Sequence, residues 1–132
     1  MDVYFSPEAF SYLEAQSLIV TQQNADGIII GHKRGQSFFV EKIVSTTKGF
    51  FPSLEKFYSL NTIYKDSIVG FYSFFTEDKK TKKILAPFGH GKLYLDIRIT
   101  KSNILQIKPY SVEYDKAFFF SPLKLARPQT KE

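Results

Sequence analysis

Apolar and polar side chains alternate most regularly over residues 92–100, KLYLDIRIT. Leucine and isoleucine occupy positions 93, 95, 97 and 99, so one face of this segment is apolar and the other polar. This period of two predicts a half-buried β-strand. Three consecutive isoleucines at 28–30 predict a strand that is covered on both faces. Two further strands are predicted over 37–45 and 67–75, with a hairpin turn at 33–36.

Other local signals predict helices and turns. A helix is expected over 6–18, because its first residue is a serine that can cap it and a proline follows at the first helical position. A second helix is predicted to begin after Ser53. Residues 24–27, NADG, have the composition of a turn. The segment 104–107 is expected to run back along the strand at 92–100.

The order of these elements predicts an α/β domain. Helix, hairpin, helix, strand, loop and hairpin follow one another, and a further strand is expected around 118–120. We expect a single domain over residues 1–126, with a mixed, curved β-sheet of hairpins that is flanked by two or three helices. Residues 127–132 are expected to form a polar tail.

The composition narrows the classes of function. The 132 residues are 43% hydrophobic and include 14 Phe and 8 Tyr, enough apolar surface for a packed core. Cysteine is absent, which excludes disulfides and thiolate metal sites, and we expect neither a metal nor a cofactor. Without a secretion signal or an apolar run of about 18 residues, we expect a cytoplasmic protein away from membranes. The formal charge of +5 is compatible with an acidic partner and equally with solubility alone.

Three segments resemble the JAB1/MPN (Mov34) domain family. Residues 24–45, NADGIIIGHKRGQSFFVEKIVS, are similar to the family's aliphatic strand, which ends in glycine and leads into a hairpin. Residues 67–75, SIVGFYSFF, are similar to the strand in which an aliphatic-Val-Gly-Trp-Tyr run precedes His-Ser-His-Pro. The helix at 6–18 begins with SPEAF, which has the character of the family's helix start. The resemblance extends to residue 75 and implies an MPN-like fold.

Active members of that family are zinc isopeptidases. Two histidines and an aspartate bind Zn²⁺, a glutamate is the general base, and a serine helps to hold the oxyanion. The resemblance places the base at Asn24, the histidines at Ser73 and Phe75, the aspartate near Ala86, the proline at Thr76, and the serine at Phe74 or near Lys83. Since these positions lack the family's ligands and base, the resemblance implies a pseudoenzyme. It would act as a protein-binding scaffold whose partner is another protein, such as a second MPN-type domain or a copy of itself.

The candidate contact residues of such a scaffold are Phe74, Phe75 and Thr76, at the end of the strand over 67–75. If the two rings are exposed, they offer an apolar surface to a partner. If they pack under the following loop, they belong to the core. The sequence leaves both interpretations open.

Two other functions remain open at this point. Nucleic-acid binding is suggested by the run Lys79, Lys80, Lys82 and Lys83 and by Tyr94 and Arg98 on the polar face of one strand. An enzyme would need a site around His32 or His90, the two histidines of the chain. Their spacing does not resemble a pair of metal ligands on one element.

Overall fold

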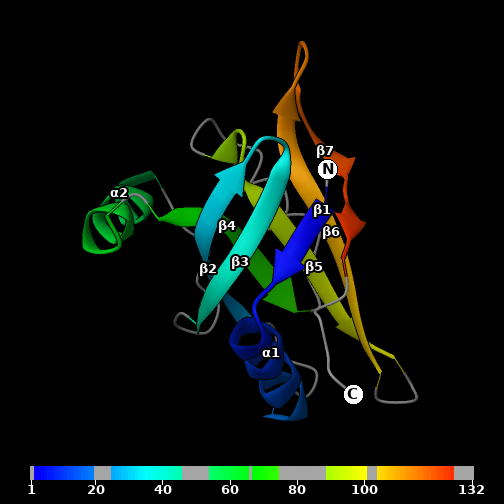
Figure 1. Ribbon diagram of the computed structural model, residues 1–132. Coiled ribbons are helices and arrows are strands. Elements are labelled where there is room, and N and C mark those ends of the chain that lie inside the picture. Colours follow the sequence, from blue (N-terminus) through cyan, green and yellow to red (C-terminus); the bar gives the residue numbers. More distant parts are fainter. Residues whose placement is uncertain are drawn as a thin grey trace.

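The computed structural model describes residues 2–19, 25–45, 54–65, 67–74, 89–100 and 104–126. Within these residues it contains two helices and eight strands (Figure 1). The helices are α1 (Pro7–Ile19) and α2 (Leu54–Ile63), and the strands are β1 (Asp2–Phe5), β2 (Ala25–Arg34), β3 (Ser37–Ser45), β4 (Ile68–Phe74), β5 (Leu93–Ile99), β6 (Leu105–Tyr114), β7 (Phe118–Pro122) and β8 (Lys124–Leu125).

The strands form one mixed sheet in the order β7-β6-β5-β4-β2-β3-β1-β8. Its two ends are joined by the same C-terminal segment. The Leu123 N–H donates to the Pro109 carbonyl on β6 at 3.0 Å, and the Ala126 N–H donates to the Val3 carbonyl on β1 at 2.9 Å. Between these bonds lies β8, which pairs with β1 in parallel. The sheet therefore curls into a nearly closed barrel.

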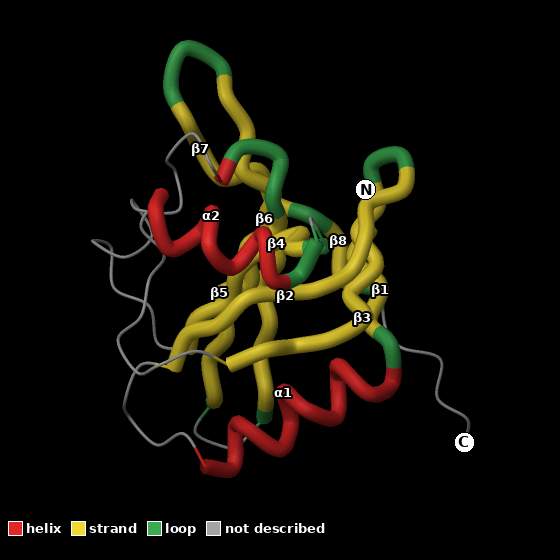
Figure 2. Tube along the Cα trace, turned by 90° about the vertical axis from the view of Figure 1, so that its left-hand side faces the viewer, coloured by secondary structure: helices red, strands yellow, loops and turns green. Residues whose placement is uncertain are grey.

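The inside of the barrel holds the main core. Buried side chains from strands across the whole sheet order meet there, among them Val3 of β1, Phe38 of β3, Tyr72 of β4 and Leu95 of β5. Helix α1 lies across one end of the barrel, whereas the β2–β3 and β6–β7 hairpins project at the other end (Figures 1 and 2). Alternate residues of the strands thus supply one continuous interior.

The start of α1 ties this helix to the sheet. The Ser6 hydroxyl accepts a hydrogen bond from the Ala9 N–H at 3.0 Å and donates one to the Glu41 carbonyl of β3 at 2.9 Å. Serine at this position satisfies an amide that the helix itself leaves without an acceptor. The cap predicted from the sequence is confirmed, and it fixes α1 over the end of β3.

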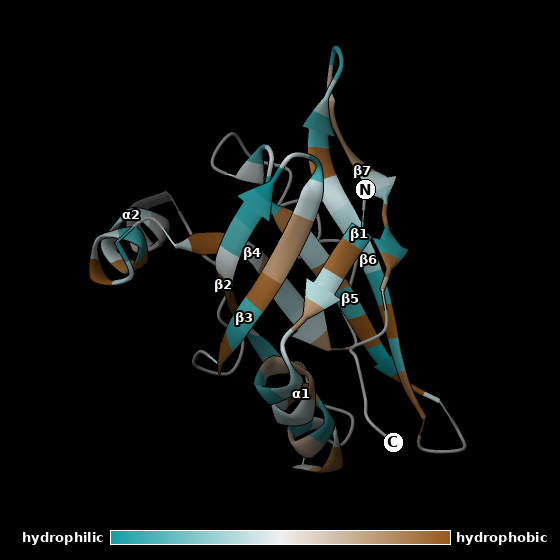
Figure 3. Cartoon of the chain, viewed as in Figure 1, coloured by the Kyte–Doolittle hydropathy of each residue, from teal (hydrophilic) through white to brown (hydrophobic). Residues whose placement is uncertain are grey.

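The outer face of the sheet carries a second apolar cluster. It contains Ile28, Phe71 and Tyr94, and Leu60 of α2 and Tyr64 in the turn after α2 pack against it. Hydrophobic and hydrophilic bands alternate along the strands, while the tip of the β6–β7 hairpin is hydrophilic (Figure 3). The apolar run at 28–30 is therefore covered on both faces, as its sequence predicts.

The structure confirms a mixed α/β architecture with a curved sheet and two helices, and it corrects some boundaries. Gly35 has a φ of 62° in the predicted hairpin turn. Residues 25–27, predicted as part of a turn, instead belong to β2. Position 27 of this strand requires glycine, because a Cβ would overlap the ring of Tyr72 and the carbonyl of Val44. Strands β1 and β8 were not predicted.

Replacing Leu13 with alanine should destabilise the fold strongly. Leu13 is fully buried where α1 meets the barrel, so its loss leaves a cavity. We expect a loss of about 2–5 kcal/mol in the free energy of unfolding by urea. The matched control is Leu18→Ala on the same helix, because Leu18 is 85% exposed and should change stability by less than about 0.5 kcal/mol. Equal effects of the two changes would contradict the placement of α1.

Burial raises the pKa of the Tyr72 phenol above its ordinary value, and its hydrogen bond to Gln16 opposes this only in part. The folded state therefore favours the neutral phenol. Its contribution to stability is complete below the unfolded pKa of 10.0 and is lost as the pH rises beyond it. Unfolding measured at pH 9 and pH 11 should show a smaller alkaline loss for Tyr72→Phe than for Tyr58→Phe, whose ring is exposed. Identical losses would argue against a buried phenol.

Candidate functional site

The start of β2 and the end of β4 lie side by side. Asp26 pairs with Ser73 and Ala25 pairs with Phe74 in the antiparallel register of these strands. Ser73 is 0% exposed and Asp26 is 3% exposed, and the serine hydroxyl donates to Asp26 Oδ1 at 2.7 Å. This pair is a polar spot within a face that is otherwise apolar. A buried hydroxyl and carboxylate stabilise each other only while both are present.

The polar spot continues onto β5. Asp96 pairs with Ser73 in the parallel register of β4 and β5, and its Oδ1 accepts a bond from Arg98 Nε at 3.3 Å. The described residues contain no group of three or more side chains that could hold a metal ion. His90, in the turn before β5, lies with its ring against Phe118. Among the described residues, no imidazole contacts the Ser73 hydroxyl, whose one described partner is the carboxylate of Asp26.

Several predicted site residues lie elsewhere than expected. Phe74 is fully buried and packs edge-on against Tyr72, so of the two interpretations that the sequence left open it belongs to the core and is not an exposed contact ring. The reason is the pleat of β4, because Ser73 faces outward and its neighbour must face the barrel interior. Tyr94 is buried against Phe120, so its prediction as a surface for stacking nucleic-acid bases is wrong. Arg98 is exposed and pairs with Asp96. Outside the described residues lie Asn24, Phe75, Thr76, Lys79, Lys80, Lys82, Lys83 and Ala86.

A row of stacked rings crosses the outer face of three neighbouring strands, β1, β3 and β2. Tyr4 of β1, Phe39 of β3 and His32 of β2 form what we call the aromatic ladder. The ring centroids of Tyr4 and Phe39 are 4.9 Å apart with an interplanar angle of 11°, and those of His32 and Phe39 are 5.0 Å apart at 9°. Each neighbouring pair is also a direct cross-strand pair. Such pairs are the unit that stabilises one face of a sheet.

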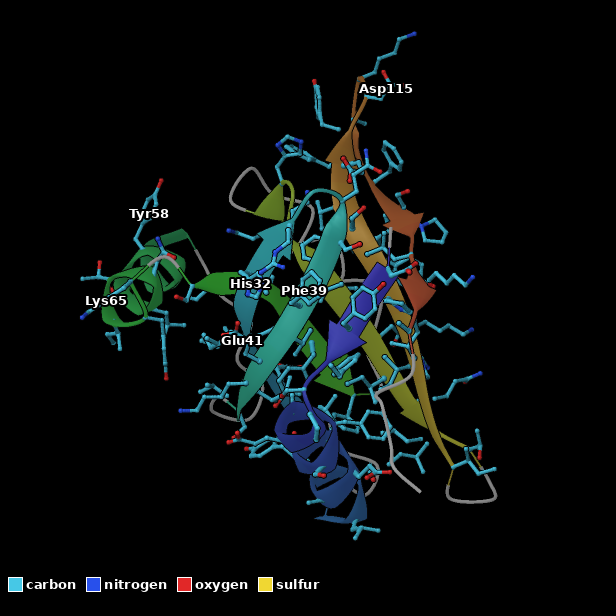
Figure 4. The ribbon with its side chains drawn as sticks, in the orientation of Figure 1. His32, Phe39, Glu41, Tyr58, Lys65 and Asp115 are labelled. Carbon is cyan, nitrogen blue, oxygen red and sulfur yellow. The ribbon has the colours of Figure 1, made fainter. Side chains whose placement is uncertain are left out.

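Charged groups surround the aromatic ladder. His32 Nδ1 lies 2.7 Å from Glu41 Oε2, and the Tyr4 hydroxyl donates to Asp2 Oδ2 at 3.2 Å. The Arg34 guanidinium lies 5.3 Å from the centre of the Phe39 ring. Figure 4 shows His32, Phe39 and Glu41 together on β2 and β3, away from Tyr58 and Lys65 of the α2 region. The ladder is thus a preformed surface in which rings, a cation and carboxylates alternate.

The aromatic ladder was missed in the sequence, although part of it could have been found. A two-residue turn at 35–36 places Arg34 opposite Ser37 and His32 opposite Phe39. The sequence therefore contains the signal for the His32–Phe39 pair. Tyr4 carries no such signal, because the parallel pairing of β1 with β3 spans more than 30 residues.

Comparison with known proteins bears on the fold alone. No model of a known protein family matches this chain, and no curated protein matches it. Among solved structures, it is similar to the solution structure of protein DSY2949 from Desulfitobacterium hafniense, with a TM-score of 0.64 and 13% identity. The match covers 95% of this chain and 93% of the other. Neither of the helices described in the structure is long and apolar enough to span a membrane.

Removing the Ser73 hydroxyl should lower the free energy of unfolding by more than the loss of one oxygen atom from a surface side chain would. In Ser73→Ala, the buried Asp26 carboxylate loses the donor at 2.7 Å, and we expect the free energy of unfolding to fall by about 1–3 kcal/mol. The control is Ser17→Ala, because Ser17 is bonded only to a carbonyl of its own helix at the surface. If unfolding in guanidinium chloride gave the same midpoint for both variants, the hydrogen bond between Ser73 and Asp26 would contribute nothing measurable to stability.

Proposed function

We propose that this chain is a catalytically inactive MPN-like domain that binds another protein through the aromatic ladder. The proposal combines the resemblance in sequence with the chemistry of two places on the barrel, the strand ends at Ser73 and the ladder around Phe39. The observation that carries it is the partly exposed stack of three rings on strands, which no helix of the described residues covers.

The strand ends support an inactive site. The resemblance assigns the family's base to Asn24, directly before β2, and its first ligand to Ser73 near the end of β4, and the start of β2 and the end of β4 are neighbours in the sheet. At the first ligand position stands Ser73, whose hydroxyl is bonded to a buried carboxylate. The next residue, Phe74, faces the core. Zinc in proteins is bound by imidazole, thiolate or carboxylate, and a neutral hydroxyl is a poor replacement for any of them.

The aromatic ladder has the features of a protein-binding surface. Tyr4 is 39% exposed, and Phe39 is partly exposed beside it. Rings that stand on paired strands are already ordered, so a partner would meet little loss of side-chain entropy. Tyrosine and arginine are also the side chains that most often dominate binding energy.

The charges favour an acidic partner. Glu41 is engaged by His32 and Asp2 by Tyr4, whereas Arg34 lies over a ring and forms no ion pair within the described part of the chain. The whole chain has a formal charge of +5. We therefore propose a protein segment in which carboxylates alternate with apolar side chains. Its carboxylates would meet Arg34, and its apolar side chains would lie along the ladder.

Variants of the ladder should weaken capture of the partner. The full chain is used as bait in nuclease-treated lysate, and the captured protein is then purified and its affinity measured. Phe39→Ala should raise the dissociation constant about 30-fold and Arg34→Gln about tenfold, as central contacts do. Raising the salt concentration should weaken the wild-type complex more than the Arg34→Gln complex.

Matched controls come from α2 and the turn after it. Tyr58→Ala removes an exposed ring and Lys65→Gln an exposed cation on the part of the surface away from the ladder (Figure 4). Both should bind as the wild type does, and all four variants should keep the wild-type circular dichroism. Capture that is lost on nuclease treatment, or that is insensitive to Phe39→Ala, would refute the proposal. If the captured partner is a second copy of this chain, the proposal holds only if Phe39→Ala dissociates the oligomer.

A further inference from the structure

The end of the barrel opposite α1 contains a cavity of about 350 Å³ between the two hairpins. Lys33, Gln36 and Phe38 of the β2–β3 hairpin form one wall. The other wall comes from β6, β7 and the residue that follows them, with Ser111, Glu113, Ser121 and Leu123. The mouth of a β-barrel is a common place for a ligand, and this volume is at the lower end of the roughly 300–1,000 Å³ of ligand pockets.

The cavity exists because the interior of the barrel changes character along β6. Interior positions are apolar at Leu105 and Ile107, which pack against the main core. Ser111 lies two residues beyond Pro109 on the same face of β6, and Glu113 occupies the next interior position. Apolar packing therefore stops before the end of the strand is reached. A strand that only closed a core would have no need for a buried serine and a carboxylate there.

The two walls carry opposite charges. Glu113 Oε2 accepts a hydrogen bond from the buried Ser111 hydroxyl at 2.7 Å, which fixes the carboxylate on its wall. On the facing wall, the Lys33 ammonium lies 5.1 Å from the centre of the Phe38 ring. The two charges form no ion pair with each other among the described residues. A ligand between them meets an ammonium on one side and a carboxylate on the other.

Apolar groups complete the cavity. Phe38 is buried and Leu123 partly buried, and both line it. Phe119 is the cross-strand partner of Glu113, so it stands on the same face of the hairpin, and its ring is 44% exposed. An exposed aromatic ring thus stands beside the carboxylate on the same face of the hairpin.

We propose that this cavity binds a small zwitterion that carries an ammonium, a carboxylate and an apolar side chain, as a free amino acid or a dipeptide does. The ligand carboxylate would face Lys33 and Gln36, its ammonium would face Glu113, and its side chain would lie on Phe38 and Leu123. A simple anion would be repelled by Glu113 and a simple cation by Lys33, so the paired charges select a dipolar ligand. The site is distinct from the aromatic ladder, and each can fail without the other.

The test titrates the isotope-labelled full chain with four probes and follows its amide chemical shifts. The probes are phenylalanine, its methyl ester, N-acetylphenylalanine and glycylphenylalanine. Phenylalanine or the dipeptide should shift the amides of 33–38 and 111–123 saturably. The ester, which lacks the carboxylate, and the N-acetyl compound, which lacks the ammonium, should each bind at least about tenfold more weakly. If phenylalanine binds more tightly, the site prefers free amino acids. If glycylphenylalanine binds more tightly, it prefers dipeptides.

Two variants assign the charges. Lys33→Met should weaken the binding of phenylalanine about tenfold and should not weaken that of the methyl ester, because the ester has no carboxylate to lose a partner. Glu113→Gln should weaken the binding of phenylalanine about tenfold and should not weaken that of N-acetylphenylalanine, which has no ammonium to lose a partner. Lys65→Met, which removes a cation remote from the cavity, should change nothing. The proposal is overturned if neither zwitterion shifts these amides up to about 10 mM, or if the ester or the N-acetyl compound binds as tightly as phenylalanine.

Discussion

The closure of the sheet by its last strands is the constraint on which the rest of the structure depends. After β7 leaves β6, the chain needs only Leu123 to cross to β8, and the bond from Ala126 to Val3 holds that strand beside β1. Without this link, β1 would be an open edge and the apolar face of β1 and β3 would meet solvent. With it, one interior forms, α1 covers one of its ends (Figure 1), and a cavity remains at the other end between two hairpins.

The pleat then sorts neighbouring residues into different roles. Ser73 reaches the outer face and Phe74 the interior, although the two are adjacent in the sequence. The same holds on β3, where Phe38 lies in the core and against the cavity while Phe39 is the centre of the aromatic ladder. The alternation of side chains along a strand therefore decides which surface each residue joins. Two rings that are adjacent in the sequence of a strand lie on opposite faces of the sheet.

This explains how much could be predicted from the sequence. The helix at 6–18, the hairpin at 33–36 and the alternating strand at 92–100 follow from local capping, turn and period-two signals, and they are present. Strand β8 has only two residues and exists through its pairing with β1, so local pattern could not reveal it. The sequence left the exposure of Phe74 open, because an abrupt polar break after a strand says where the strand ends and nothing about the direction of its last side chain. Asp26, hidden in an apparent turn, was missed as the partner of Ser73.

The two ends of the barrel therefore differ in what they can offer a partner. At the end near α1, the neighbouring termini of β2 and β4 hold a hydroxyl and a carboxylate that are buried and bonded to each other. The Ser73 hydroxyl is therefore already committed to Asp26 and gains little from a ligand. At the other end, Lys33 and Glu113 face each other across a cavity without pairing, so their charges can still be satisfied from outside. Because Phe38 and Phe39 are adjacent on β3, the register of this one strand places both the wall of that cavity and the centre of the ladder. A shift of β3 by one residue would exchange the two rings and abolish both surfaces at once.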